Sequence, residues 1–307
     1  MVDSSLRLFS ADLAVVVSPT WLTSSLLWLH LATVTLFVLG MVLALRRPAT
    51  QAQGVERLIP FGPTFFAVPL ALFGLQHFVF LSEVKEVVPS WMPWHIFWAC
   101  LVGVALIAAC LSLITDIKAG LAGLLTGIML FLFVLMLDLP GLIQNPHERL
   151  AMVGTLRDLS LSGPALALAG ASLLAARRLS WLVEVGRWFF GVSIVYFGAE
   201  QFLHPEFAPG VPFPVPMPAW MPGHTVWAWA AGTALVAGGV CILARWHART
   251  ASAWVGVVFL VFVIFIYLPR DIVHPSIDIS RELDDIAGTL AESGAALLLA
   301  GALPRKP

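Results

Sequence analysis

The segment PSWMPWHIFWACLVG at residues 89–103 returns as PAWMPGHTVWAWAAG at residues 218–232, and we call the separation between Pro89 and Pro218 the repeat offset. Two other segment pairs return in the same order: FGLQHF at 73–78 with FGAEQF at 197–202, and LPGLIQNP at 139–146 with LPRDIVHP at 268–275. The last pair has the repeat offset, whereas the FG pair is closer together, because the Pro-rich stretch after His204 is longer in the second copy. Segments that recur in a fixed order indicate that one unit was duplicated and fused.

The composition of the 307-residue chain indicates a membrane protein. Hydrophobic residues make up 59% and charged residues 11% of the sequence, whereas soluble domains carry roughly 25% charged residues. So few polar side chains cannot cover a folded chain in water, and the sequence therefore predicts the lipid bilayer as its surroundings. The formal net charge of −1 argues against nucleic acid as a partner.

The apolar segments are long enough for helices that cross a bilayer, each of which needs roughly 20 mainly apolar residues. None of them alternates as a strand does, and only helices or closed barrels satisfy their backbone groups in lipid. The sequence therefore predicts an all-α polytopic membrane protein with nine transmembrane helices. Their predicted bounds are 22–45, 60–81, 95–115, 119–139, 154–175, 186–203, 224–244, 252–268 and 284–303.

The duplication divides these helices into one N-terminal transmembrane helix and two four-helix repeats. Each repeat has an even number of spans, so both enter from the same side and form parallel repeats about an axis along the membrane normal. The segment between the repeats is basic and partly amphipathic, which suits a helix at the membrane surface. The predicted parts are an outer segment at 1–21, a helix at 22–45, a cytoplasmic linker at 46–59, repeat 1 at 60–175, a cytoplasmic linker at 176–187 and repeat 2 at 188–303.

Lysine and arginine are concentrated in alternate loops. With the N-terminus outside, eleven of the 17 lie on the cytoplasmic side and six lie outside. The positive-inside rule thus predicts an outer N-terminus and a cytoplasmic C-terminus. The expected membrane is the inner membrane of a bacterium. Seven of the eight histidines then lie at or near the outer face, so the sequence predicts a ligand site on that side.

Polar side chains occur at equivalent positions near the outer end of the first helix of each repeat. Gln76 and His77 stand in the first copy, and Glu200 and Gln201 stand in the second. Ionisable groups at membrane depth usually face the interior of a bundle or a wet cavity, which makes these four residues candidate ligand-binding groups. The alternative is that they reach out to the headgroup level.

The two W-M-P segments carry tryptophan and histidine at matching positions. Trp91 and Trp220 precede a proline, and His95 and His224 begin the next helix. A helix N-terminus disfavours imidazolium, so both histidines are expected to be neutral and able to accept a proton or bind a ligand. The alternative is an aromatic belt with a signal for the start of a helix.

Charged residues also enter the helices of the first repeat. Arg157 and Asp158 lie in the first turns of its fourth helix, and Asp138 ends its third helix. These three residues are predicted to form a charged cluster, and Glu292 is matched with Asp158 as its equivalent in the second copy. The alternative is a purely structural ion pair, because buried charges need partners wherever they occur.

The sequence contains few features that favour a metal, haem or nucleotide site. The histidines show neither H-x-x-x-H spacing nor a Cys-rich partner, and neither a phosphate loop nor a nucleophile motif is present. The sequence therefore predicts no metal, haem or nucleotide cofactor. Cys100, Cys110 and Cys241 lie in apolar stretches without a C-x-x-C pair, which argues against thiol–disulfide exchange.

These features together resemble the DoxX/DoxD-like family of four-helix membrane proteins, here in tandem. The resemblance rests on F-G-x-x-x-F at 73–78, on W-M-P at 91–93 before a Trp-containing helix, and on the four-span length, and it covers about 60–303. The family includes the small subunit of a thiosulfate:quinone oxidoreductase. The resemblance therefore implies a quinone-linked redox subunit with a quinone pocket on the outer face and a soluble or membrane redox partner there.

Two other functions compete with this one. A small-molecule transporter would place its site between the two repeats, although the predicted bilayer centre holds almost no charge. A non-enzymatic scaffold or assembly subunit would use the Gly- and Ala-rich faces at 119–127 and 163–171 to pack against a partner. The sequence alone leaves open whether the protein is an enzyme.

Overall fold

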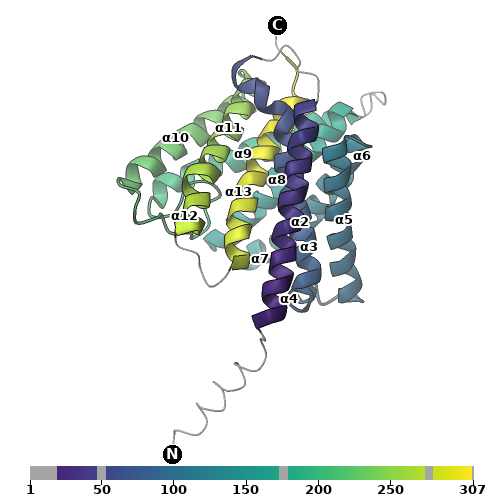
Figure 1. Cartoon of the computed structure of the whole chain (residues 1–307). Coiled ribbons are helices and arrows are strands. Elements are labelled where there is room, and N and C mark those ends of the chain that lie inside the picture. The colour runs from purple at the N-terminus through teal and green to yellow at the C-terminus, as the bar shows by residue number, and fades with distance from the viewer. Residues whose placement is uncertain (1–18, 47–52, 173–178, 274–278, 306–307) are drawn as a thin grey trace, which may run out of the picture.

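The computed structural model describes residues 19–46, 53–172, 179–273 and 279–305, and these ranges form a bundle of helices without a named strand (Figure 1). Seven helices in the described ranges are long and apolar enough to cross a membrane. The all-helical, multi-pass character predicted from the sequence is thus confirmed. The seven spans are Leu27–Arg46, Gly54–Val79, His95–Thr115, Ala119–Gln144, Trp181–Leu203, His224–Leu243 and Ala248–Ile272.

The helices follow one another with short connections. In chain order they are α2 (Pro19–Arg46), η1 (Gly54–Phe61), α3 (Gly62–Val79), α4 (Leu81–Val87), α5 (His95–Thr115), α6 (Ala119–Phe133), η2 (Val134–Asp138), α7 (Leu139–Gln144), α8 (Arg149–Ser172), α9 (Trp181–Leu203), α10 (His224–Leu243), α11 (Ala248–Phe262), η4 (Val263–Tyr267), α12 (Leu268–Val273) and α13 (Ile279–Ala302). We call the end that carries 89–94 and 218–223 the W-M-P end. The opposite end, where α9 and α11 begin, is the arginine end.

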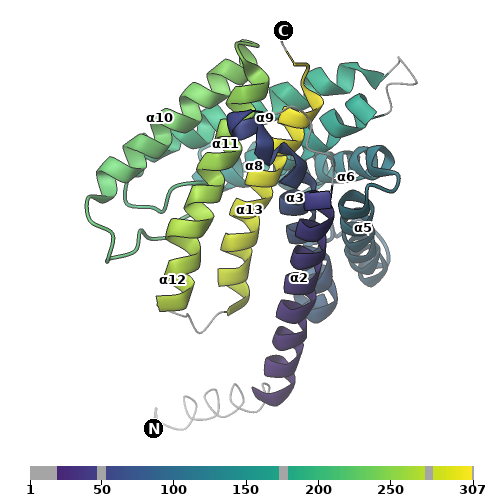
Figure 2. The same cartoon turned by 45° about the horizontal axis from the view of Figure 1, so that its top comes forward.

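The predicted spans 154–175 and 284–303 correspond to α8 and α13 at the centre of the bundle, which are not among the seven apolar helices. Each of the two has 24 residues, long enough to cross a bilayer, but α13 holds five charged residues and α8 is rich in Gly, Ala and Ser. α13 packs against α3, α8 and α11, and α8 packs against α6 and α9 (Figure 2). Because neighbouring helices cover them, they need less apolar surface than a helix that faces lipid.

The helix contacts connect the two predicted repeats crosswise. α3 packs against α5 and also against α13, the last helix of the chain. α9 packs against α10 and also against α8. The first helix of each predicted repeat therefore packs against the last helix of the other.

Local backbone features recur at the repeat offset. The π-helical turns η2 and η4 are related in this way, and each is followed by a short helix, α7 or α12. Trp98 and Trp227 each donate a hydrogen bond from Nε1 to the carbonyl of a W-M-P proline, Pro93 or Pro222, at 2.9 and 3.2 Å. The left-handed backbone conformations also pair in the two copies: Trp94 with Gly223, Asp116 with Arg245, and Lys118 with His247.

Glycines bring the helices into close contact. A Cβ atom on Gly186 would overlap the carbonyl oxygen of Gly163, where α9 crosses α8. A Cβ atom on Gly294 would overlap the backbone nitrogen of Phe66, where α13 crosses α3. Both contacts leave room for a hydrogen atom only, which is the usual role of small residues at helix contacts in membranes.

Two serines join neighbouring helices at matching positions. Ser162 donates a hydrogen bond of 2.8 Å to the carbonyl of Gly127, and Ser293 donates one of 2.7 Å to the carbonyl of Gly256. We expect Ser162→Ala and Ser293→Ala each to lower the free energy of unfolding by about 0.6 kcal/mol, and at most about 1.7 kcal/mol. Denaturant titration in detergent micelles measures this, with the exposed Ser82→Ala as control. Effects no larger than that of the control would contradict the expectation.

The structure differs from the sequence prediction between the two repeats. α9 begins at Trp181 and so occupies part of the predicted linker 176–187, while residues 173–178 lie outside the described ranges. Arg187 is buried inside α9 because its guanidinium donates to the carbonyls of Ile242 and Leu243 at the end of α10. In this segment Leu182, Gly186 and Arg187 are buried, whereas Trp181 is exposed, so the start of α9 packs against the bundle on one face.

Candidate functional site

The candidate site is the contact between α8 and α13, where Glu292 is fully buried. Glu292 lies near the middle of α13, so it would lie near the centre of a bilayer that this helix crosses. The hydroxyl of Ser160, near the middle of α8, lies 2.5 Å from Oε1 of Glu292. Glu292 is therefore an ionisable group enclosed between α8 and α13.

The contacts of Ser160 favour a proton on Glu292. Its Oγ lies 2.6 Å from the carbonyl of Arg157 and 2.5 Å from Glu292. A serine hydroxyl has one proton and can donate to only one of these two acceptors. Both short contacts are favourable when Ser160 donates to the carbonyl and a protonated Glu292 donates to Ser160.

The second carboxyl oxygen of Glu292 also favours a proton on this group. Among the described residues, Oε2 is buried without a hydrogen-bond partner. Burial of an ionised carboxylate without full hydrogen bonding is costly, and a bound proton removes most of that cost. The arrangement is thus suited to holding a proton at the centre of the bundle.

Arg157 is the cation nearest to this carboxyl group. It acts electrostatically on Asp138, Asp158 and Glu292. Its guanidinium also lies over the rings of Phe73 and Phe213, with its Cζ atom 5.5 and 5.9 Å from the ring centres. The predicted charged cluster of Asp138, Arg157 and Asp158 is thus brought together, but no ion pair joins its members within the described ranges.

The charges around Arg157 do not balance. The charge of one guanidinium acts on three carboxyl groups, those of Asp138, Asp158 and Glu292, and Oδ2 of Asp138 is also buried without a hydrogen-bond partner among the described residues. Buried charges need partners, so the excess carboxyl groups require protons or a bound cation. This excess is the main chemical property of the site.

A small cavity opens beside Arg157 toward the W-M-P end. Its volume is about 90 Å³, and Tyr267, Asp285 and Thr289 line it together with apolar residues of the loop 204–223. Small-molecule pockets commonly measure about 300–1,000 Å³, so this cavity suits water or a small ion. Thr289 lies one helical turn from Glu292 on α13, so the cavity reaches toward the buried carboxyl group.

Polar contacts at the W-M-P end hold α13 to its neighbours. Gln76 on α3 donates a hydrogen bond of 2.6 Å to Asp284. Arg270 on α12 pairs with Asp271 and with Asp285, at 2.8 and 2.9 Å. These contacts place the start of α13 beside the small cavity.

A buried ion pair secures the loop 204–223. Nε of Arg149 lies 2.5 Å from Oε2 of Glu200, whose side chain is 8% exposed. The same guanidinium donates to the carbonyl of Pro212 at 2.6 Å and lies over the ring of Phe207, 5.2 Å from its centre. Arg149 therefore ties the loop to α8 and α9.

The structure separates the predicted site residues into three groups. Gln76, Asp138, Arg157, Asp158 and Glu292 lie around the α8–α13 contact through the links given above. Glu200 and Gln201 lie under the loop 204–223, where Gln201 donates to the carbonyl of Gly210 at 3.4 Å. The third group, Trp91, His95, Trp220 and His224, lies in the W-M-P segments, where both tryptophans are exposed and both histidines are half-buried.

His77 lies away from the α8–α13 contact. Its Nδ1 is 2.7 Å from the carbonyl of Phe73 in the preceding turn of α3, and its Cβ faces Gly103 of α5. The W-M-P segments begin α5 and α10 with identical Trp-to-Pro hydrogen bonds. These contacts agree with the alternative interpretation of the segments as signals for the start of a helix.

Four residues outside the predicted set belong to the site: Arg149, Ser160, Arg270 and Asp284. Arg149 and Arg270 were counted only as outer cations in the loop charges. The outer loops that contain Arg149 and Arg270 hold more carboxylates than cations. This excess is the signal that could have shown that the two arginines pair with buried carboxylates. Ser160 carries no such signal, because serine is common in packed membrane helices.

The helix contacts also revise the alignment of Glu292 with Asp158. The serine bonds to Gly127 and Gly256, which are related by the repeat offset, place Ser162 of α8 opposite Ser293 of α13 in the alignment of the copies. In this alignment Thr289 corresponds to Asp158, and Glu292 corresponds to Leu161. The buried carboxyl group of Glu292 is thus particular to the second copy.

The chain was compared with protein-family models, with curated proteins and with solved structures, and none of the three comparisons gives a match. Its function is therefore inferred from the buried polar groups and from their placement in the bundle.

Proposed function

We propose that the protein is a multi-pass membrane transporter that carries a coupling proton on Glu292. The observation that carries this proposal is the fully buried carboxyl group at the α8–α13 contact, held by Ser160 and left with one oxygen unpartnered among the described residues. Ionisable residues inside membrane bundles commonly serve as proton relays or ion sites. Transport sites also commonly lie near the bilayer midplane, between structural repeats.

The proposed architecture has nine spans. It adds α8 and α13 to the seven apolar helices and consists of one N-terminal helix and two parallel four-helix units. The π-helical turns, left-handed residues and Trp-to-Pro bonds that recur at the repeat offset support the duplication. In the proposed orientation the W-M-P end faces outward across a bacterial inner membrane and the arginine end faces the cytoplasm, as the positive-inside rule suggests.

The proposed transport step begins at the outer cavity. Protons enter beside Asp285 and Thr289 and reach Glu292, one turn deeper on α13. Arg157 acts electrostatically on Glu292 and stabilises its ionised form, and a proton on Glu292 lowers the excess of negative charge around Arg157. Glu292 can therefore change its protonation state without leaving an isolated charge in the bundle.

Release toward the cytoplasm requires the helices to move. Beyond Glu292, α13 continues with buried alanines and leucines from Ala295 to Ala300, so no polar path leads to the arginine end through these residues. Small side chains such as these allow helices to shift against one another. A movement of α8 against α13 would expose Glu292 alternately to the two sides.

Proton uptake into proteoliposomes tests this function. Vesicles that hold a pH-sensitive dye receive an inside-negative potassium diffusion potential, with and without a soluble cell extract as the source of co-substrate. We expect wild-type vesicles to take up protons faster than protein-free vesicles, Glu292→Gln to fall to the protein-free rate, and Glu292→Asp to keep part of the activity. A wild-type rate equal to that of protein-free vesicles, with extract present, would overturn the proposal.

The matched control for this experiment is Glu206→Gln. Glu206 is a carboxylate of the loop 204–223 whose side chain is 58% exposed. Its own backbone amide, and next to it His204, hold the pKa of Glu206 below the ordinary value for a glutamate, so it is ionised at neutral pH. We expect this variant to transport protons as the wild type does, because it removes a carboxylate that is outside the bundle.

A quinone-linked redox role and a scaffold role are the other two candidates. The cavity beside Arg157 measures about 90 Å³, which is small for a quinone ring and favours the transport proposal. Mass spectrometry of an organic extract of the purified protein distinguishes the redox role, because a stoichiometric quinone would support that role against transport.

A further inference from the structure

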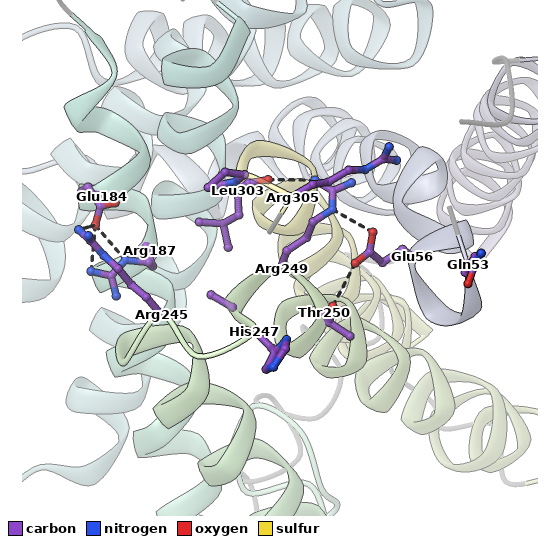
Figure 3. A pocket seen from close by; sticks show the side chains of 12 residues that line it. Gln53, Glu56, Glu184, Arg187, Arg245, His247, Arg249, Thr250, Leu303 and Arg305 are labelled. Carbon is purple, nitrogen blue, oxygen red and sulfur yellow. Dashed lines mark hydrogen bonds and ion pairs between the residues drawn. The ribbon is translucent and has the colours of Figure 1, made fainter. Parts of the chain in front are cut away.

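A larger cavity lies at the arginine end of the bundle, far from Glu292. Its volume is about 420 Å³, within the range common for small-molecule sites. Its charged lining consists of Glu56, Glu184, Arg187, Arg245, Arg249 and Arg305. Four guanidinium groups against two carboxylates leave an excess of positive charge. Figure 3 shows the Glu184 group on one side of the cavity and the Glu56 group on the other.

Two of the four arginines hold the ends of neighbouring helices. Arg187 donates to the carbonyls of Ile242 and Leu243 at the C-terminal end of α10 and pairs with Glu184 at 2.9 Å. Arg249 donates to the carbonyls of Ala300 and Leu303, at 2.8 and 3.0 Å, at the end of α13. These contacts fix the walls of the cavity, so a ligand would meet a preformed site.

Glu56 and Glu184 are already paired with these arginines. Nε of Arg249 lies 3.0 Å from Glu56, and Glu184 is shared between Arg187 and Arg245, the second at 2.8 Å. Two carboxylates cannot balance four guanidinium groups, so the lining of the cavity carries an excess of positive charge. The side chain of Arg245 is 64% exposed, so it can reach a ligand.

The N-terminus of α11 faces the same cavity. Ala248, Arg249 and Thr250 line it, and His247, the residue before the helix, provides no side-chain hydrogen bond as a cap. The first backbone N–H groups of a helix, with the helix dipole, attract anions. This feature adds to the charge of the arginines at the same place.

The corresponding positions in the first copy lack this chemistry. At the repeat offset, Asp116 corresponds to Arg245 and Gly120 corresponds to Arg249. The backbone is alike, since Asp116 and Arg245 both have a left-handed conformation. The two turns thus have a similar backbone but a different charge. Because the fold does not require arginines at these positions in the first copy, we infer that Arg245 and Arg249 serve a role specific to the second copy.

Exposed tryptophans surround this end of the second copy. Trp181, Trp188 and Trp246 are 52 to 65% exposed, and Trp246 directly follows Arg245. Tryptophan is enriched at the headgroup level of membranes. The cavity is therefore placed where lipid headgroups would reach it.

We propose that this cavity binds a phosphate-bearing anion through Arg245, Arg305 and the N-terminus of α11. Arginine forks bind phosphate oxygens in pairs, and basic pockets between membrane helices on the cytoplasmic side bind phosphorylated headgroups. The same chemistry is offered by an anionic phospholipid and by a soluble phosphate ester. The site is independent of Glu292 and of the proton-transport proposal.

Binding measurements on the full-length protein in mild detergent test this proposal. The probes are phosphatidylglycerol, phosphatidylcholine as the zwitterionic lipid, and soluble glycerol phosphate, with binding followed by native mass spectrometry and by the shift in Tm. We expect phosphatidylglycerol or glycerol phosphate to bind, and the Arg245→Gln/Arg305→Gln variant to bind at least about a hundredfold more weakly, because two charge-assisted contacts are lost. Arg57→Gln is the control, because Arg57 lies at the same end and does not line the cavity.

The two anionic probes separate the sources. Tight binding of phosphatidylglycerol that glycerol phosphate does not displace supports a lipid ligand, and displacement supports a ligand from solution. Equal binding of phosphatidylglycerol and phosphatidylcholine, together with unchanged binding of both anionic probes by the double variant, would overturn the proposal. The size-exclusion profile and circular dichroism of each variant show whether it is folded.

Discussion

Gly294→Ala is expected to lower the free energy of unfolding by about 3 kcal/mol, because the added methyl group has no space. Its Cβ atom would overlap the backbone nitrogen of Phe66 on α3 and would lie 2.6 Å from the Cα atom of the same residue. A side chain could turn away from such a contact, but the backbone of a packed helix cannot. The contact is relieved only if α13 moves away from α3, which would also disturb the bond between Gln76 and Asp284.

Thermal or denaturant unfolding in detergent measures this effect. Gly186→Ala tests the other crossing, where the new Cβ atom would overlap the carbonyl oxygen of Gly163, and we expect a loss of similar size. Gly154→Ala is the matched control, since nothing lies within 4 Å of its Cβ position on α8. This control should be neutral or stabilising by up to about 1 kcal/mol. A Gly294→Ala variant as stable as the control would mean that α13 and α3 do not cross this closely.

Arg149→Met is expected to be similarly damaging, with a loss of about 3–5 kcal/mol. The substitution leaves the carboxylate of Glu200 buried and without its 2.5 Å partner. It also removes the hydrogen bond to Pro212, so the loop 204–223 should become more sensitive to protease. Equilibrium unfolding and limited proteolysis measure the two consequences.

The double variant Arg149→Met/Glu200→Gln separates the ion pair from the packing of its side chains. A neutral glutamine has no charge to bury, so we expect the double variant to recover a large part of the lost stability. Arg157 should be unaffected, since the pair lies at the W-M-P end of α8 and α9. If the double variant loses as much as the sum of the two single variants, the pair is not coupled.

The helix starts show what the sequence predicts well. Segments 89–94 and 218–223 predicted helices from His95 and His224, and α5 and α10 begin at these residues. The reason is local: a proline that lacks an N–H group and a nearby tryptophan determine the turn before each helix. The all-helical class was predictable for an equally simple reason, since composition alone excludes a water-soluble chain.

The candidate site was less predictable because its contacts depend on the packing of helices far apart in sequence. Asp138, Arg157 and Asp158 could be grouped from the sequence, since they lie on neighbouring helices of one unit. The partner of Glu200, Arg149, lies 51 residues away, and the partner of Gln76, Asp284, lies 208 residues away. Hydropathy does not encode which faces meet at such distances.

The burial of Glu292 between α8 and α13 could not be predicted, for another reason. Its helix combines Gly, Ala and Ser with charged residues, and such a sequence fixes neither the register nor the face of a helix by periodicity. The match of Glu292 with Asp158 differs by about one helical turn from the alignment of Ser162 with Ser293 that the serine bonds support. A shift of one turn keeps the face of a helix and changes which residues are matched, so Glu292 was paired with Asp158 in place of Leu161.

The crossed packing of α3 against α13 has a consequence for biosynthesis. Phe66 leaves the ribosome long before Gly294, and chains grow at about 5–20 residues per second, so α3 waits on the order of ten to fifty seconds for its partner. During that time its buried face must be shielded by lipid, by α5 or by the insertion machinery. If translation ended shortly before Gly294, the first four-helix unit would be fully translated, but α3 would lack α13 as its packing partner.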